Sequence, residues 1–153
     1  MNEFKSIEEI LDFAIKREEE EYEFYEQWKD KVRQDIRPLF EKLAEEEKGH
    51  KVKLLWVKSG KLKDFLEAGS QGILDLKMSD YLVDIEPKPN ISYQDALILA
   101  IKREKMAFKL YEDLANKSSN KEIKDLFIAL AQEEARHKLK LELLYDEYFY
   151  PTG

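Results

Sequence analysis

Two short segments of the sequence combine a glutamate with a histidine three residues later: Glu47 with His50, and Glu134 with His137. On an α-helix, side chains three positions apart lie on one face, so each pair can present a carboxylate oxygen and an imidazole nitrogen together. The chain contains no cysteine, which excludes disulfides, thiolate catalysis, Cys-ligated zinc and iron–sulfur clusters. These residues therefore indicate a metal ion held by oxygen and histidine nitrogen.

The two pairs occupy matching places in an internal repeat. Leu39–His50 and Leu126–His137 share the pattern LFxxLAxEExxH, and Ala14–Glu18 recurs letter for letter as Ala100–Glu104. The distance between the copies is far longer than the period of solenoid repeats. The sequence therefore indicates a duplicated helical hairpin, in which each copy supplies one Glu-x-x-His pair and one further glutamate at the end of its AIKRE segment.

Signals for helix ends predict four long helices. Serine caps open the first, third and fourth helices, and a proline lies in the first turn of the second. The start signals are Ser6, Pro38, Ser92 and Ser119, and the expected ends of the first three helices are near Asp30, at Gly60 and within 116–118. The fourth helix is expected to continue to about Tyr148.

The lengths of the connections predict the topology. Only a few residues separate the helices within about 6–59 and within about 92–148, so each range forms an antiparallel hairpin. The crossover over about 60–91 is long enough to run the length of the bundle, with short helices expected around Phe65 and Met78–Leu82. We therefore expect an all-α, ferritin-like four-helix bundle, formed as a single domain by residues 1–153.

Each predicted helix has an inward seam that is apolar except at one level. The ionisable residues at that level are Glu18, Glu47, His50, Glu104, Glu134 and His137. Buried carboxylates are costly unless they are paired or bind a metal, and four at one level repel one another. Two divalent cations would neutralise them, and this combination of residues is the ligand set of di-iron and di-manganese helical bundles. The alternative is that the histidines lie on charged surfaces and the glutamates lie in solvent.

These motifs resemble those of ferritin-like di-iron-carboxylate proteins, most closely the rubrerythrin family, over nearly the whole chain. The resemblance implies two terminal carboxylate ligands, two bridging carboxylates and two terminal imidazoles. In that order these are Glu18 and Glu104, Glu47 and Glu134, and His50 and His137. The cofactor that the resemblance implies is two iron ions, with manganese or mixed metals as alternatives.

Three further residues are candidates for the same site, two tyrosines and one glutamate. Tyr25 and Tyr111 resemble family tyrosines that lie beside the ligands, and the alternative is that they are ordinary core aromatics. Rubrerythrins carry an additional glutamate three residues after the ligand of the third helix, where this sequence has Ala107. The counterpart of that position in the first repeat is Glu21, a candidate seventh ligand. Its alternative is a solvated face, because it belongs to the run of glutamates Glu18–Glu21.

The resemblance implies a redox enzyme that reduces hydrogen peroxide or dioxygen. Full-length rubrerythrins carry a rubredoxin module with Cys-x-x-Cys pairs, and this sequence has no cysteine. Electrons must therefore come from elsewhere, and an external donor protein is a candidate source. Two alternatives keep the metal site: a ferroxidase that oxidises Fe(II) and so handles iron, and a metal-binding bundle without turnover. A metal-free helical adaptor is the fourth hypothesis, which stoichiometric metal content would exclude.

The charge balance argues against two classes of partner. Lys and Arg number 26 and Asp and Glu 33, which gives a net charge of −7, whereas binding to nucleic acid or anionic lipid requires clustered cations. The apolar stretches are far shorter than the roughly 18 residues of a membrane span, and the first residues lack the apolar core of a signal peptide. We expect no nucleic acid or membrane partner, and a cytoplasmic homodimer.

Overall fold

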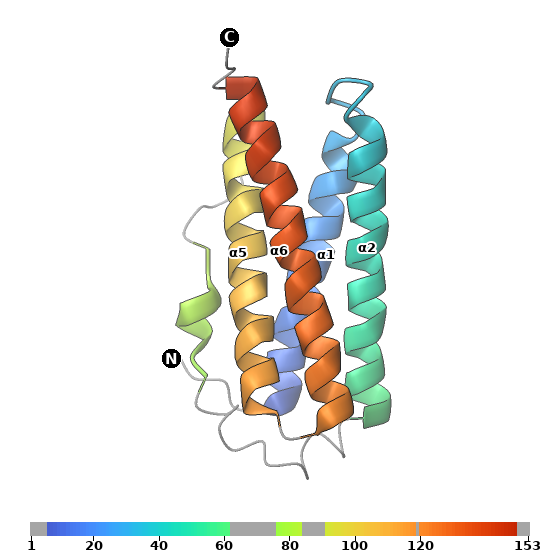
Figure 1. The fold of residues 1–153 in the computed structure, drawn as a ribbon, viewed down its shortest axis with the longest axis vertical. Helices are drawn as coiled ribbons and strands as arrows, with labels where there is room; N and C mark the ends of the chain where they lie inside the picture. The colour runs from blue at the N-terminus through green and yellow to red at the C-terminus, as the bar shows by residue number, and fades with distance from the viewer. Residues whose placement is uncertain (1–5, 62–75, 84–90, 119, 150–153) are drawn as a thin grey trace.

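The computed structural model describes residues 6–61, 76–83, 91–118 and 120–149. Its long helices are α1 (Ile7–Trp28), α2 (Arg37–Trp56), α5 (Tyr93–Lys117) and α6 (Lys121–Phe149). They lie side by side along the long axis, with α1 packed against α2 and α5 packed against α6 (Figure 1). The fold is the all-α, ferritin-like four-helix bundle that the sequence predicts.

The directions of the helices require a long return path between α2 and α5. In Figure 1, α1 and α6 run upward while α2 and α5 run downward, so α2 ends far from the point where α5 begins. Within this crossover, a 3-10 turn (η2, Met78–Tyr81) lies against α5 and matches the short helix predicted there. The other predicted short helix, around Phe65, lies outside the described residues.

Side-chain caps fix the starts of three helices. The backbone N–H of Glu9 donates to Ser6 Oγ at 3.0 Å, and the N–H of Asp95 donates to Ser92 Oγ at 3.1 Å. Both predicted caps are therefore confirmed. At the start of α6 the cap is Asn120, whose Oδ1 accepts from the N–H of Ile123 at 3.0 Å. The predicted cap at Ser119 lies outside the described residues.

The prediction that Gly60 ends the second helix was wrong. The α-helix ends at Trp56, and the backbone continues through Gly60 as a π-helical turn (η1, Val57–Lys61). A glycine that stops a helix adopts a left-handed conformation, and Gly60 does not. The helical path persists because Val57 is fully buried in the core with Leu54, and only a continued helix keeps both side chains inward.

The apolar core forms two clusters, one toward each end of the bundle. One includes Leu11, Leu54, Leu110 and Phe127, and the other includes Phe24, Phe40, Leu97 and Leu141. In each of the four long helices, the buried ionisable residues lie in sequence between the members of these two clusters. The bundle therefore encloses one polar layer between two dry apolar layers.

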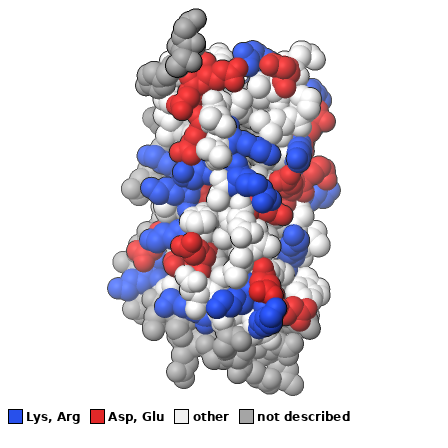
Figure 2. All heavy atoms as spheres, in the orientation of Figure 1, with Lys and Arg blue, Asp and Glu red and all other residues white. Residues whose placement is uncertain are grey.

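Charged side chains of both signs cover the face of the bundle that Figure 2 shows. Figure 2 shows Lys and Arg interleaved with Asp and Glu on one face, with uncharged side chains between them. Among the described helices, none combines the length and the apolar character that crossing a bilayer would require.

Candidate metal centre

The polar layer consists of seven ionisable side chains that are at most 1% exposed. These are Glu18, Glu21, Glu47, His50, Glu104, Glu134 and His137. The alternative that the histidines lie on charged surfaces and the glutamates in solvent is therefore wrong. Each of these residues lies on the inward face of its own helix, so all seven side chains point into the bundle interior.

Six of these residues form two overlapping groups in which the candidate ligand atoms lie within 4.8 Å of one another. Glu18 and His50 belong only to the first group, which we call the Glu18 half. Glu104 and His137 belong only to the second, which we call the Glu104 half. Glu47 and Glu134 belong to both, so their carboxylates are placed to bridge two ions. The sequence prediction named the same six residues.

Both imidazole rings point Nδ1 into the site. His50 Nδ1 lies 2.5 Å from Glu134 Oε1, and His137 Nδ1 lies 2.5 Å from Glu47 Oε1. These contacts are close but lack the geometry of a hydrogen bond. The two rings are stacked, with centroids 5.8 Å apart. Nitrogen and oxygen lone pairs that face each other at this separation can both be directed at a shared cation.

Two carboxylates that the sequence prediction missed hold the outer nitrogens of the rings. His50 Nε2 is hydrogen-bonded to Glu133 on α6, and His137 Nε2 lies 2.5 Å from Glu46 Oε2 on α2. A ring that donates Nε2–H to a carboxylate keeps Nδ1 unprotonated and fixes the orientation of the ring, which raises its value as a metal ligand. The repeat could have indicated these two residues, because a glutamate directly precedes the candidate bridging carboxylate in both copies.

Replacing Glu46 or Glu133 by alanine is expected to lower metal affinity about 10- to 100-fold, because the ring it orients would be free to turn or change tautomer. Anaerobic calorimetric titration of each variant with Mn(II) measures this change. Glu45→Ala is the matched control, since Glu45 is an exposed glutamate on the same helix. Equal affinity in the wild type and in both variants would show that the two carboxylates do not position the rings.

Tyr25 and Tyr111 are fully buried, and each hydroxyl reaches a carboxylate on the facing helix. Tyr25 donates to Glu104 Oε1 at 2.9 Å, and Tyr111 donates to Glu18. Burial first, and then the nearby carboxylates, raise the pKa of each phenol well above its ordinary value, so both remain neutral donors. The two tyrosines pack in the core and also hold one oxygen of each terminal carboxylate.

Crowding shifts the protonation of the metal-free site. Burial and then the neighbouring carboxylates raise the pKa of Glu47 and Glu104 well above the ordinary value, and the pKa of Glu134 is also raised. Burial favours a lower pKa for His50, but the carboxylates of Glu134 and Glu18 outweigh it and raise the pKa to about 11. The metal-free layer therefore retains protons that bound cations would displace.

Glu18 is the exception among the candidate ligands. Burial favours a higher pKa for its carboxyl group, but the contacts with Glu47 and His50 outweigh it and lower the pKa. Within the crowded layer, Glu18 is therefore the carboxylate that stays ionised. Its charge in turn raises the pKa of Glu134.

The polar atoms left without partners fit a metal centre. The buried atoms that lack a hydrogen bond include both oxygens of Glu47 and Glu134, one oxygen each of Glu18 and Glu104, and Nδ1 of both histidines. Buried polar atoms nearly always have partners in native proteins, and these belong to the six candidate ligands. Carboxylate oxygen with imidazole nitrogen is a donor set that iron, manganese, cobalt and zinc accept.

The family model for rubrerythrin matches residues 9–64 and 95–153. The chain belongs to the rubrerythrin family. No curated protein and no solved structure gives a significant match. The two matched ranges contain all six candidate ligands, and because the sequence has no cysteine they hold no rubredoxin-type site. The rubrerythrin match is therefore to the di-iron domain, as the motifs indicated.

A cavity of about 160 Å³ lies between α1 and α2 of this rubrerythrin-family chain, beside the metal layer. Glu18 and Glu47 line it, together with Tyr22 and two lysines. One of these, Lys51, pairs with Glu19 across the cavity at 3.2 Å. The cavity has room for a few water-sized molecules.

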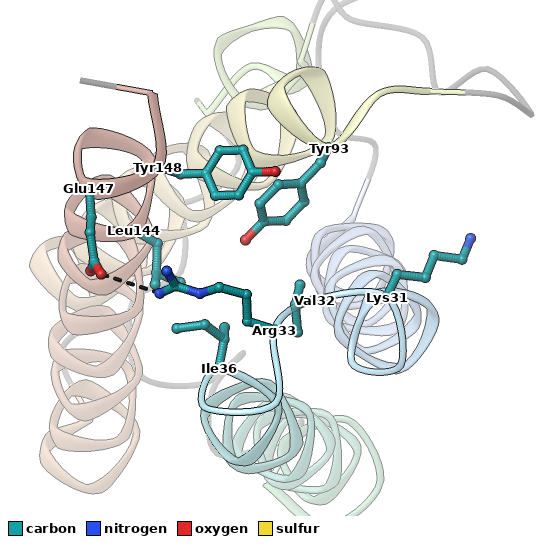
Figure 3. A pocket seen from close by; sticks show the side chains of 8 residues that line it. All are labelled: Lys31, Val32, Arg33, Ile36, Tyr93, Leu144, Glu147 and Tyr148. Carbon is teal, nitrogen blue, oxygen red and sulfur yellow. Dashed lines mark hydrogen bonds and ion pairs between the residues drawn. The ribbon is translucent and has the colours of Figure 1, made fainter. Parts of the chain in front are cut away.

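A second cavity, of about 130 Å³, lies at the end of the bundle and contains none of the candidate ligands (Figure 3). Its walls include the α1–α2 connection, Tyr93 and Tyr148. Arg33 Nη2 donates to Glu147 Oε1 at 3.2 Å across it and so links that connection to α6. This cavity therefore lies where the ends of the helices meet and is separate from the metal layer.

Proposed function

We propose that the protein is an oxidoreductase with a di-iron carboxylate centre that reduces hydrogen peroxide with electrons from an external donor protein. The observation that carries the proposal is the pair of overlapping ligand groups, which share two carboxylates and leave their inward atoms without partners. Membership of the rubrerythrin family supports the redox class. Manganese or a mixed-metal centre fits the same donor set.

The six candidate ligands would coordinate two ions. Glu18 and His50 would hold one ion, and their counterparts in the Glu104 half would hold the other. Glu47 and Glu134, which belong to both groups, would be shared between the two ions. Tyr25 and Tyr111 keep the terminal carboxylates turned inward through the hydrogen bonds that they donate. The apolar clusters on either side exclude bulk water, which strengthens the interactions between the carboxylates and cations.

The electron count favours peroxide over dioxygen as the oxidant. When bound, two ferrous ions supply one electron each, and hydrogen peroxide takes up two electrons and two protons to give two water molecules. Dioxygen needs four electrons for the same end point, twice what the centre holds. The external donor returns two electrons for each peroxide reduced. The cavity of about 160 Å³ beside Glu18 and Glu47 has a volume that suits an oxidant of this size.

The diferrous protein is expected to be oxidised faster by hydrogen peroxide than by dioxygen, with repeated turnover only when a reductant is added. Anaerobic loading with Fe(II), followed by separate additions of the two oxidants in a stopped-flow absorption experiment, measures both rates. The zinc-loaded protein is the control and should show no turnover, because zinc has no redox chemistry. Faster oxidation by dioxygen, with mineral accumulating beyond two irons per chain, would indicate a ferroxidase instead.

A further inference from the structure

Glu21 makes the two halves of the metal layer unequal. It lies one helical turn beyond Glu18 on α1, is 1% exposed, and its carboxylate faces Glu104 rather than solvent. The alternative that it belongs to a solvated face is therefore wrong. The counterpart of Glu21 in the repeat is Ala107, which is buried but has no polar side-chain atom. The Glu104 half thus has a nearby carboxylate that the Glu18 half lacks.

The oxygens of Glu21 have the same property as the candidate ligand atoms: both are buried and neither has a hydrogen-bond partner. Among the described residues, the only such atoms outside the polar layer are Arg17 Nε and Glu20 Oε1. An ionised carboxylate can accept about four hydrogen bonds, and burial without any of them is costly. Both oxygens of Glu21 are therefore available to coordinate a cation within the polar layer.

Arg103 balances the charge of Glu21 without occupying its oxygens. Arg103 Nε lies 3.8 Å from Glu21 Oε1, beyond hydrogen-bonding distance, while Arg103 Nη2 contacts Glu20 at 3.4 Å. An ion pair that stabilised the fold would place an N–H group of the guanidinium directly on the carboxylate, as bidentate pairs do. The arrangement instead leaves both oxygens of Glu21 without a hydrogen bond from the guanidinium.

We propose that Glu21 is a seventh metal ligand that serves only the Glu104 half, and that the centre consequently loads in a fixed order. The first divalent ion binds to the Glu104 half, where Glu21 adds a second terminal carboxylate, and the second ion binds to the Glu18 half. Divalent ions that prefer oxygen are held more tightly by a site with more carboxylates at short range. This inference rests on the proposed function of the layer as a two-metal centre.

The test is anaerobic calorimetric titration of the metal-free protein with Co(II) alone, with the visible absorption of Co(II) followed in parallel. The wild type is expected to show two resolved binding phases. Glu21→Gln is expected to weaken the tighter phase by about tenfold or more and to leave the weaker phase unchanged, because a direct ligand contributes at least as much as an outer-shell partner. His137→Gln should weaken the tighter phase, and His50→Gln the weaker one.

A structural role for Glu21 predicts a different result. If the Glu21 side chain serves only packing or a contact with Arg103, Glu21→Gln leaves both Co(II) affinities unchanged, whatever its effect on the melting temperature of the metal-free protein, and this result would overturn the inference. Two equal phases in the wild type would also overturn it while leaving the two-metal centre intact. A wild type that binds no Co(II) would instead refute the proposed function. The double variant Glu21→Ala, Ala107→Glu moves the extra carboxylate to the Glu18 half. In this background, His50→Gln should weaken the tighter phase and His137→Gln the weaker one.

Discussion

Replacing either bridging carboxylate, in Glu47→Gln or Glu134→Gln, is expected to reduce binding from two metal ions to one at most. Peroxide-dependent turnover should fall by more than about 100-fold, since losing an outer-shell partner alone costs 10- to 100-fold. The reason is that each of these side chains belongs to both ligand groups, so a single substitution removes an oxygen from both ions. Metal content by elemental analysis and turnover with a chemical reductant measure the two effects.

The matched control for these variants is Glu45→Gln, which changes an exposed glutamate on the same helix as Glu47. It should leave metal content and turnover unchanged. Since Glu47 is a buried carboxylate whose pKa is raised by burial and then by its neighbours, its neutral variant should fold at least as well without metal. A loss of activity through misfolding is thereby separated from a loss of ligands. Two ions per chain in Glu47→Gln and Glu134→Gln would disprove the bridging assignment.

Removing the metal is expected to lower the melting temperature by at least about 10 °C near neutral pH. A ligand present at 1,000 times its dissociation constant stabilises the folded state by about 4 kcal/mol for each site. For a chain of this length, each kcal/mol corresponds to about 2–4 °C. Scanning calorimetry of the loaded protein, and of protein freed of metal and chelator by dialysis, measures the difference. Equal melting temperatures would show that the carboxylates do not depend on cations.

The direction in which the stability of the metal-free protein changes with pH follows from the shifted pKa values. Burial first, and then neighbouring charge, raise the pKa of Glu47 and Glu104 in the folded state above the ordinary value of 4.5. The stability from such groups is complete below the pKa of the unfolded chain and is lost as the pH rises through the folded pKa. His50 acts with the same sign, because its pKa rises from 6.5 to about 11.

The melting temperature of the metal-free protein should therefore increase on acidification from about pH 8 to about pH 5. The lowered pKa of Glu18 acts in the opposite direction, but its stabilisation is lost only as the pH falls below 4.5. The loaded protein should show the opposite trend in this range, since protons compete with metal for the same ligands. A metal-free protein that is less stable at pH 5 than at pH 8 would contradict the crowded layer.

The sequence by itself determined the helical bundle and the level of the metal layer, because both follow from local rules. The caps at Ser6 and Ser92 depend only on residues within the first turn. The spacing of Glu47 and His50 places them on one helix face wherever the helix lies. The repetition of the pattern in a second hairpin then made a shared site in the bundle interior the simplest arrangement.

Only the tertiary structure decided what surrounds the ligands, because those contacts depend on the register between helices that are distant in sequence. The hydrogen bonds from the two histidines cross between α2 and α6, so neither ring's partner lies on its own helix. The run Glu18–Glu21 winds around α1, and its composition does not reveal which members face inward. The packing of α5 beside α1 buries Glu21 against Glu104 while Glu19 remains at the surface beside Lys51. Whether a glutamate of this run is buried thus depends on which helix packs against it, and the residue type alone does not decide it.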